Sequence, residues 1–271
     1  MISLSINYFA FAVEDNPTPD GFESEALQKA PVWEFGAGVA SLYLPDYHGS
    51  NEYRPYLFPV PYIVYRGDKL RIDDAGVTGK LLNTKRFMLD ISGGAGMPVG
   101  KRSKIRAGMP ELNPTVEFGP MLTIFLYDTN RKHWSLNIAV REVVSVGLDG
   151  VKPKGRVLAP HLKYHVLKEK RWDDFYEFYI SLSPTFGSKK YHHYYYGVDS
   201  EYVTNERAQY SAVAGYQGTR FTITYKIRKK NRWLGTFFQY ESLKEAVFET
   251  SPLVQSQNFF AVGLASSWVF Y

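Results

Sequence analysis

Four consecutive segments of this sequence alternate between apolar and polar or small residues over ten or more positions each. In 115–128, every second residue from Val116 to Leu126 is apolar, and the positions between them carry residues such as Glu117. The segments 133–146, 157–166 and 175–187 follow the same rule. A period of two places successive side chains on opposite faces of a β-strand. These segments are therefore predicted to be strands with one apolar face.

The length of these segments favours lipid as the medium that covers the apolar face. Tilted strands of about 9–11 residues cross a bilayer, whereas strands of soluble proteins usually have about 5–6 residues. Aromatic residues also gather near the segment ends, as in the two girdles of membrane barrels. A soluble sandwich or lipocalin-like barrel would give the same alternation. We nevertheless predict an all-β fold, a transmembrane antiparallel β-barrel. The aromatic residues near segment ends are Tyr127, Trp134, Tyr176, Trp233, Trp268 and Phe270.

Composition excludes several other classes of protein. The 271 residues include 45% hydrophobic and 16% aromatic residues, with a mean hydropathy of −0.28. No stretch approaches the roughly 20 apolar residues of a spanning helix, but a barrel averages to near-neutral hydropathy. The absence of cysteine excludes disulfides, thiolate zinc sites and a cysteine nucleophile. The net charge of +5 is spread along the chain and indicates a solvated surface rather than a nucleic-acid partner.

The predicted number of strands is about twelve, with ten as the alternative. Short and long connections alternate along the chain, as expected for outer-membrane barrels with short periplasmic turns and longer outer loops. This alternation requires the segment 68–82 to be split into two strands at Asp74-Ala75. The strands are expected at 33–44, 55–65, 68–73, 76–82, 86–97, 114–128, 132–146, 155–168, 174–187, 210–228, 231–244 and 257–271.

The beginning of the chain resembles the end of a secretory signal peptide. Residues 1–12 are apolar and end in Ala10-Phe11-Ala12, and the sequence then becomes acidic and rich in proline. We predict a signal-peptide remnant at 1–12, a polar periplasmic leader at 13–31 and the barrel at 32–271. The alternative is a first strand at 2–9.

The stretch from residue 33 to residue 82 carries a family pattern. It contains a glycine-rich first strand, then P-D-Y-x-G-S-x-x-Y-R, then two prolines at Pro59 and Pro61 and a tyrosine, Tyr65, before a short turn. Weaker similarity continues in GMPELNPTVEFGP and in YHHYYYGVDSEYVTNE. The chain resembles the MipA/OmpV family of Gram-negative outer-membrane proteins from about residue 32 to its end. The motif residues, which we treat as a candidate binding loop, are Pro45, Asp46, Tyr47, Gly49, Ser50, Tyr53 and Arg54.

The resemblance implies a location in the outer membrane of a Gram-negative bacterium. It also implies a role as a scaffold in envelope assembly that binds murein-synthesis and murein-hydrolysis proteins, namely a lytic transglycosylase and a penicillin-binding protein. Of the periplasmic segments, only the predicted leader at 13–31 is long enough to contact such partners, since the turns are short.

The predicted inward faces of the strands carry charges of both signs on long side chains. In a narrow barrel such groups can pair across the lumen and nearly fill it. This favours a packed interior, and the alternative is a narrow channel for small, anionic solutes. The predicted lumen-lining residues are Asp90, Glu117, Asn137, Arg141, His161, Lys163, Glu177, Arg220, Lys226 and Glu241.

Three other groups of residues are candidates for chemistry or for lipid binding. His192, His193, Asp199 and Ser200 lie in one loop and are the residues a hydrolase would need, although neighbours in one loop seldom form a catalytic triad. His161 and His165 would need further ligands to bind a metal. We therefore expect a protein that is not an enzyme and has neither cofactor nor metal. Four basic residues on a predicted outer loop are candidate contacts for lipopolysaccharide phosphates. They are Lys101, Arg102, Lys104 and Arg106.

Overall fold

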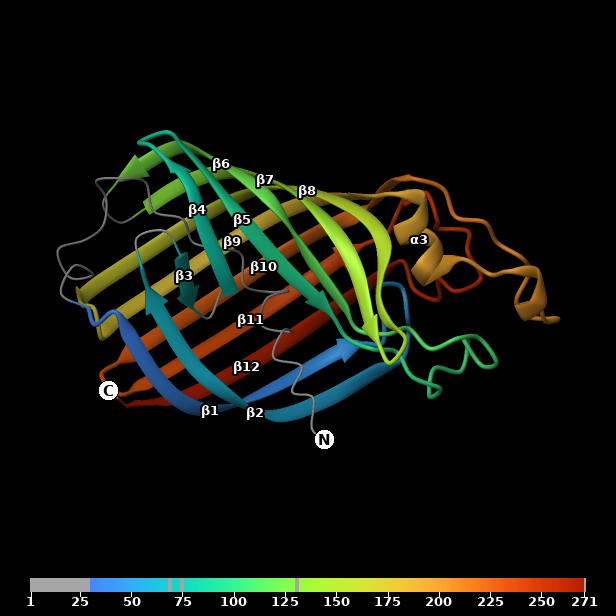
Figure 1. Cartoon of the computed structure of the whole chain (residues 1–271), viewed down its shortest axis with the longest axis horizontal. Coiled ribbons are helices and arrows are strands. Elements are labelled where there is room, and N and C mark those ends of the chain that lie inside the picture. Colours follow the sequence, from blue (N-terminus) through green and yellow to red (C-terminus); the bar gives the residue numbers. More distant parts are fainter. Residues whose placement is uncertain (1–29, 68–69, 74–75, 130–131, 271) are drawn as a thin grey trace.

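The computed structural model describes residues 30–67, 70–73, 76–129 and 132–270. The predicted segment 1–12, most of 13–31, and the pair Asp74-Ala75 lie outside the described residues. Strands β1 to β12 form a closed barrel in which each strand pairs with its neighbours in the chain and β12 pairs with β1 (Figure 1). The strands are β1 Trp33–Pro45, β2 Tyr53–Arg66, β3 Leu70–Asp73, β4 Gly76–Asn83, β5 Phe87–Gly96, β6 Thr115–Thr129, β7 Lys132–Gly147, β8 Gly150–Arg171, β9 Asp174–Gly187, β10 Gly215–Lys229, β11 Arg232–Ser242 and β12 Asn258–Phe270.

Among the described residues, the helical elements lie in one connection between strands. Helix α3 (Lys189–Tyr196) and a short 3-10 helix (Ser200–Tyr202) both occur between β9 and β10. In the described part of the chain, no helix has the length and apolar character needed to cross a membrane. The prediction of an all-β, antiparallel fold is confirmed, since all the strand pairs are antiparallel.

Alternation of apolar and small residues explains how the first and last strands meet. The ladder between β1 and β12 runs from Phe35 opposite Phe270 to Tyr43 opposite Val262. A Cβ at Gly36 would lie 2.5 Å from the carbonyl oxygen of Trp268, so the close approach of these strands requires glycine at position 36. Closure removes the free edges that the terminal strands would otherwise expose.

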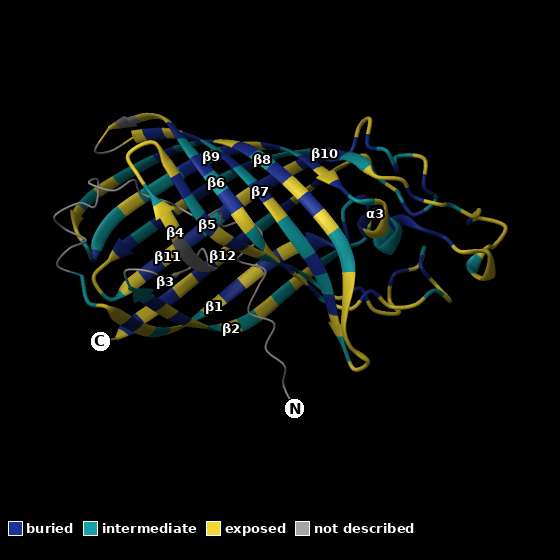
Figure 2. Cartoon of the chain, turned by 45° about the horizontal axis from the view of Figure 1, so that its top comes forward, coloured by how far each residue is buried: buried dark blue, intermediate teal, exposed yellow. Residues whose placement is uncertain are grey.

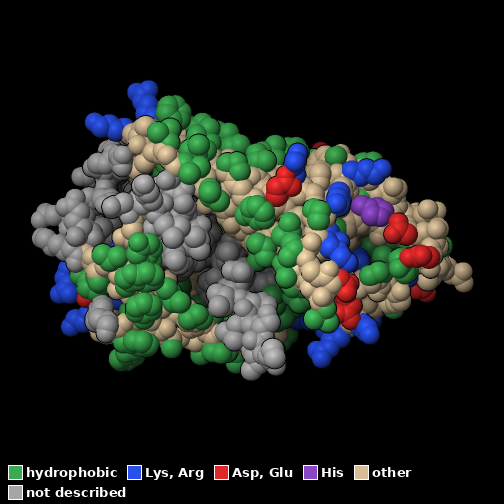
Figure 3. Space-filling view, viewed as in Figure 1, with side chains coloured by type: hydrophobic (Ala, Val, Ile, Leu, Met, Phe, Trp, Pro, Cys, Tyr) green, Lys and Arg blue, Asp and Glu red, His purple; other side chains and the backbone are tan. Residues whose placement is uncertain are grey.

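The faces predicted from the alternation are confirmed. On β12, Phe260, Leu264 and Trp268 are exposed on the outside, and the intervening Ala261 and Ala265 are buried. Alternating exposed and buried residues are visible along the strands in Figure 2. Figure 3 shows apolar side chains over the visible wall of the barrel and charged side chains at its two ends. An exposed apolar band around a barrel is what hydrocarbon, rather than water, would cover.

The two ends of the barrel differ in their connections. At one end, which we call the turn end, the connections are short and the C-terminus lies beside them (Figure 1). At the other, the loop end, four long connections meet; we call them together the loop cap. The loop cap comprises residues 46–52, 97–114, 188–214 and 243–257.

One predicted loop is wrong. A long connection was expected at 147–154, but β7 and β8 continue as a hairpin joined through Leu148 and Asp149, and β8 begins at Gly150. Residues 152–155 contain Pro153 and Gly155, and the structure accommodates Pro153 in the strand where the register shifts between Val143 and Val144. A bulge of this kind absorbs a residue that cannot donate to the ladder.

Prolines within the strands coincide with gaps in the pairing. Pro160 of β8 and Pro184 of β9 fall opposite each other in a stretch that lacks residue pairs, between Leu158 opposite Phe186 and Leu162 opposite Leu182. Because neither proline has an N–H, no donor is orphaned there. Ser183 donates a hydrogen bond of 3.0 Å to the carbonyl oxygen of Pro160.

The wall has its fewest residue pairs between strands at the hairpin formed by β3 and β4. Strand β3 has four residues, and it pairs with β2 only through Tyr65 opposite Ile72 and Arg66 opposite Arg71. The count of strands therefore depends on the shortest ladder of the barrel.

Candidate functional site in the barrel interior

The interior at the turn end is crossed by buried ion pairs. Arg228 of β10 donates to Glu34 of β1 at 2.9 Å and to the hydroxyl of Tyr62 of β2 at 2.8 Å. Glu34 also pairs with Arg66. Since β10 and β1 are separated along the wall by β11 and β12, the Arg228–Glu34 pair bridges the inner face of these two strands. Glu34 is 0% and Arg228 is 1% exposed, so the pair is shielded from water.

A second network lies on the inner face of the wall from β7 to β10, towards the turn end. His165 Nδ1 lies 2.8 Å from His133 Nε2, and His165 Nε2 lies 3.0 Å from a Glu177 carboxylate oxygen. The other Glu177 oxygen is 3.4 Å from the Lys226 ammonium. The ammonium of Lys163 lies 4.4 Å from the centre of the Tyr179 ring, in cation–π geometry. Buried charges are thus compensated by opposite charges and by an aromatic face.

Towards the loop end, further pairs lie on the interior face. Arg141 Nε donates to Ser92 Oγ at 3.0 Å, and its guanidinium is 3.8 Å from the Glu117 carboxylate. Arg220 and His48 both face Glu241, at 2.9 and 3.2 Å. These positions lie on the same face of each strand as the small or polar residues of the alternation. Their side chains therefore point into the barrel.

All ten residues predicted to line the lumen are buried or half-buried in the structure. Asn137 accepts a 2.7 Å hydrogen bond from Thr123 and donates one of 3.1 Å to Ser135. The buried members are Asp90, Glu117, Asn137, His161, Lys163, Lys226 and Glu241, and the half-buried members are Arg141, Glu177 and Arg220.

The candidate binding loop forms the connection between β1 and β2 and is held by its own side chains. Arg54 donates two hydrogen bonds to Asp46, of 2.5 and 2.9 Å, across the base of the turn. Gly49 has a positive φ of 96°, which favours glycine, and its carbonyl accepts from Gln255 and Ser256.

The remaining motif residues attach this turn to the end of the chain. Tyr47 donates a 2.6 Å hydrogen bond to the Leu253 carbonyl, and the Tyr53 hydroxyl accepts from the amide of Phe260 at 3.2 Å. Ser50 Oγ accepts from the amide of Glu52, and Pro45 ends β1. The motif therefore builds a turn and fastens it to the β11–β12 connection.

Helix α3 forms the centre of the loop cap. Its N-cap Ser188 accepts from the amide of Tyr191, as capping requires. Tyr196 stacks on Phe248 at a ring-centre distance of 3.7 Å and donates to the His48 carbonyl at 3.0 Å. Four connections far apart in sequence thus share one apolar cluster. Its buried members are Tyr47, Val99, Leu112, Tyr196, Leu243, Ala246, Phe248 and Phe259.

One of the four predicted lipopolysaccharide contacts is not at the surface. Lys101, Arg102 and Lys104 are exposed, but Arg106 is 7% exposed and donates to the Tyr195 carbonyl at 3.0 Å. Arg106 is directed inward because the 97–114 connection folds over α3 and offers it carbonyl acceptors. It therefore holds the loop cap together, and the prediction that Arg106 is a surface contact for lipopolysaccharide is wrong.

Burial in the loop cap shifts the pKa values of its ionisable groups. Burial raises the pKa of Tyr194 to about 12 and raises that of Tyr47, while it lowers the pKa of Arg106. Burial also lowers the pKa of His192, whose Nδ1 lies 2.7 Å from the Val213 carbonyl. The cap is therefore built around neutral tyrosines and a neutral imidazole.

The candidate hydrolase residues are in separate environments. His193 lies 3.2 Å from Asp199 at the surface, whereas His192 is buried against Phe248. Ser200 begins the 3-10 helix. No hydrogen bond between a serine hydroxyl and either imidazole occurs in the part of the chain that the structure describes. Within the same residues, no group of three metal-ligating side chains converges.

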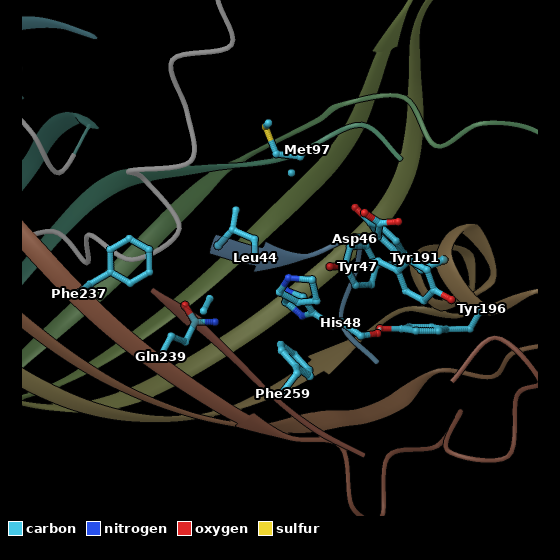
Figure 4. A pocket seen from close by; sticks show the side chains of 14 residues that line it. Leu44, Asp46, Tyr47, His48, Met97, Tyr191, Tyr196, Phe237, Gln239 and Phe259 are labelled. Atoms are coloured by element: carbon cyan, nitrogen blue, oxygen red, sulfur yellow. The ribbon is translucent and has the colours of Figure 1, made fainter. Parts of the chain in front are cut away.

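A pocket lies beneath the loop cap, inside the barrel (Figure 4). It comprises about 720 Å³, part of which is open to solvent. Leu44, Phe237 and Phe259 give it apolar walls, and His48 and Gln239 supply polar atoms. The other lining residues are Pro45, Asp46, Tyr47, Gly96, Met97, Tyr191, Tyr195, Tyr196 and Ala261.

Comparison of the sequence with protein families gives one match, to the family described as MltA-interacting protein MipA, over residues 37–270. The chain belongs to the MipA family. The resemblance inferred from the motif at 45–54 is confirmed, and with it the location in the outer membrane of a Gram-negative bacterium. No curated protein matches the sequence. Outer-membrane barrels have short periplasmic turns and longer extracellular loops, and we adopt this orientation for the turn end and the loop end.

Several solved structures are similar to this MipA-family chain at low levels. An outer membrane channel from Pseudomonas putida F1 is 13% identical, with 94% of this chain and 100% of that chain covered and a TM-score of 0.43. A bacterial polysaccharide outer membrane secretin is 7% identical, with 88% and 98% covered and a TM-score of 0.40. The CymD monoaromatic hydrocarbon channel is 9% identical, with 98% of each chain covered and a TM-score of 0.33. TM-scores this low carry no functional argument.

Sequence reasoning missed the pocket of this MipA-family barrel. The sequence did not single out Phe237, Phe259 or Ala261, and Tyr195 and Tyr196 belonged only to the tyrosine-rich stretch YHHYYYGVDSEYVTNE. The pocket arises because α3 folds back over the barrel, and no periodic signal at 189–196 indicated a helix. The motif residues Pro45, Asp46 and Tyr47 are the part of the pocket that the sequence had singled out.

Proposed function

We propose that this chain is a twelve-stranded, non-enzymatic barrel that acts as a scaffold in the outer membrane and binds peptidoglycan-remodelling enzymes at its periplasmic end. The family description, which names an interaction with MltA, supports a murein-related partner. We take the interior to be blocked, which supports a scaffold over a wide pore, because the Arg228–Glu34 and Lys226–Glu177 pairs place buried charged side chains on the inner faces of two parts of the wall. A lytic transglycosylase and a penicillin-binding protein are the proposed partners.

The observation that carries this proposal is the charge of the turn end. Exposed basic residues occur in or next to the short turns, and we call them the basic rim. The nearby carboxylates Asp173 and Asp174 are already paired with Arg171 and Lys229. A positive surface of this kind attracts an acidic partner surface and speeds its association. The basic rim consists of Lys85, Arg86, Lys132, Lys168, Lys170, Arg171, Lys229, Lys230 and Arg232.

A binding experiment with charge reversals tests the scaffold. The variant Lys85→Glu/Lys170→Glu/Lys230→Glu, folded in detergent, is expected to bind a lytic transglycosylase and a bifunctional penicillin-binding protein at least about tenfold more weakly at low salt. The matched control Lys101→Glu/Arg102→Glu/Lys104→Glu makes the same change in charge at the loop end. Equal binding by both variants, or no binding by the parent protein, would contradict the proposal. Deletion of residues 13–31 separates a contribution of the leader from that of the basic rim.

The non-enzymatic part of the proposal has its own test. Lipase and protease assays on the folded protein are expected to show no turnover, because the candidate residues His192 and His193 lie in separate environments. Turnover that is lost in a His193→Gln or Ser200→Ala variant would favour the hydrolase instead.

A narrow channel for small anionic solutes is the second candidate, favoured by Lys163 and Lys226 on the interior face. Conductance in planar bilayers distinguishes the two. The blocked interior predicts no steady current, and a stable open-channel current would support the channel. Replacement of both Glu34 and Arg228 by alanine is expected to raise any conductance.

A further inference from the structure

The wall between β2 and β5 is incomplete at the level of the membrane. Strand β2 pairs with β3 only at Tyr65 and Arg66, and β4 pairs with β5 only as far as Ile91. Tyr53–Pro61 of β2 and Ser92–Gly96 of β5 therefore have no strand partner on their facing sides among the described residues. We call the space between these two stretches the lateral opening. Three inter-strand spacings separate β2 from β5, which corresponds to roughly 14 Å.

The sequence of β2 is adapted to a free edge. The amide of Arg66 donates to the carbonyl of Val32, and the carbonyl of Glu52 accepts from the amide of Asp46. Even-numbered residues of β2 therefore direct their backbone groups towards β1. The register between these points is unbroken, and odd-numbered residues therefore direct theirs towards the lateral opening.

Three of the five odd positions along that stretch are prolines. They are Pro55, Pro59 and Pro61, and the other two are Tyr53 and Leu57. Proline has no N–H, so at these positions the free edge exposes no donor that would be unsatisfied in hydrocarbon. The missing N–H groups also hinder the pairing of another strand with this edge. The edge is therefore suited to contact with lipid rather than with a partner strand.

Aromatic groups place the lateral opening within the membrane. Tyr53 packs against Tyr43 with ring centres 5.2 Å apart, and Tyr65 packs against Trp33 at 4.4 Å. These pairs mark the two interfaces at which aromatic girdles lie. The stretch of β2 between them covers roughly 30 Å along a tilted strand, close to the thickness of the hydrocarbon core. Leu57, in the middle of the opening's edge, is 75% exposed.

The pocket lies directly behind the loop-end part of this opening. Gly96, the last residue of β5 along the opening, lines the pocket together with Met97. On the other side, Leu44 and Pro45 of β1 line the pocket and pair with Arg54 and Tyr53 of β2. Figure 4 shows Leu44 and Phe237 at one end of the pocket and Tyr191 and Tyr196 at the other.

We propose that the lateral opening admits the alkyl chain of a membrane amphiphile from the outer leaflet into the pocket beneath the loop cap. Leu44, Phe237 and Phe259 provide the surface for the chain, and His48 and Gln239 lie where polar atoms at its head meet the protein. The buried ion pairs at the turn end stop the ligand from passing to the periplasm. The barrel thus binds a lipid-like molecule laterally, in addition to its proposed role as a scaffold.

Photo-crosslinking in proteoliposomes of phosphatidylethanolamine and phosphatidylglycerol tests this proposal. The full chain carries p-benzoylphenylalanine at Met97 in the pocket, at Met121 as a matched interior control, or at Leu162 as a lipid-facing control. Met121 is buried on a strand that is paired on both sides, with Asp90 and Ala139. Mass spectrometry is expected to find phospholipid adducts at Met97 and Leu162 but not at Met121.

Two results would overturn the proposal. One is the absence of lipid adducts at Met97 in protein that shows heat-modifiable mobility and crosslinks at Leu162. The other is a crosslink from Met97 to residues 1–29, which would identify the chain's own N-terminal segment as the occupant.

A blocking variant provides an independent test. The side chain added by Gly94→Trp points inward beside the opening, where a Cβ would meet the Glu117 carboxylate at an ordinary 3.5 Å. It is expected to reduce the lipid adduct at Met97 by about tenfold, which corresponds to about 1.4 kcal/mol of lost binding. Gly93→Trp, on the outward face of the same strand, is the matched control and is expected to retain the adduct. Equal adduct yields in the two variants would contradict entry through the opening.

Discussion

Strands β6 to β10 are long and are paired along most of their length, whereas the wall between β2 and β5 contains a four-residue strand and the lateral opening. The first wall satisfies its backbone groups by ladders and its buried charges by pairs such as Glu177–Lys226. In the second wall, Pro55, Pro59 and Pro61 have no N–H, so the edge of β2 has fewer donors that need a partner. A barrel in lipid therefore has two ways to reduce the number of unsatisfied donors, and only the second leaves room for a ligand.

The largest expected effect lies in the paired wall. Glu177→Leu leaves Lys226 and His165 without their carboxylate in a buried site, and it is expected to destabilise the barrel by about 3–5 kcal/mol. Urea unfolding, followed by heat-modifiable gel mobility, measures the change. The double variant Glu177→Leu/Lys226→Leu should recover most of the loss. Tyr176→Leu, on the lipid face of the same strand, is the control, and an equal loss there would contradict the pairing argument.

The parity of β2 predicts the next largest difference, between two neighbouring residues. Phe58→Pro removes an N–H that faces β1 and leaves a carbonyl of β1 unpaired in hydrocarbon, which costs several kcal/mol. Leu57→Pro changes a position that faces the lateral opening and is expected to cost less than about 1 kcal/mol. The same unfolding measurement compares them. Similar losses in both variants would show that the edge of β2 is paired.

The loop cap should respond to pH through His192. Burial lowers the pKa of this imidazole, so the closed cap holds it neutral while an opened cap takes up a proton below about pH 6.5. The stabilisation is complete above that pH and is lost as pH falls further, by at most about 1.4 kcal/mol per pH unit.

Hydrogen exchange of residues 189–199 between pH 7.5 and 5, corrected for intrinsic rates, measures this opening. The slope should disappear in His192→Phe and persist in His193→Gln, since His193 is partly exposed beside Asp199. Persistence of the slope in both variants would assign it to another group.

The smallest expected effect lies on the projecting hairpin of β7 and β8. Arg156 pairs with Glu142, and both side chains are well exposed. Arg156→Ala should therefore change the free energy of unfolding by less than about 1 kcal/mol. A loss as large as that of Glu177→Leu would mean that this hairpin packs against another surface.

The alternation in sequence was sufficient to predict the all-β antiparallel fold and the exposed and buried faces of strands such as β12, because a period of two is imposed by the pleat itself. The turn motif at 45–54 was sufficient to predict the family. The loop cap could not be predicted, since Arg106 and Tyr196 take their positions from carbonyls and rings more than fifty residues away. The hairpin at 147–150 was missed because Pro153 is accommodated by a bulge that depends on the partner strand. The lateral opening was missed because Pro59 and Pro61 were used only as part of the family pattern and not as a marker of a strand edge.

The hydrogen bond between Tyr47 and Leu253 joins residues that are 206 positions apart in the chain. The β1–β2 turn is the first exterior turn to be synthesised. It can therefore form this hydrogen bond only after the last exterior connection, between β11 and β12, has been synthesised. Insertion into the membrane must therefore be nearly complete before the loop cap can form. A polypeptide truncated before β12 would expose the aromatic cluster of the loop cap to proteases at the cell surface. A protease-resistant loop cap therefore indicates that biogenesis is finished.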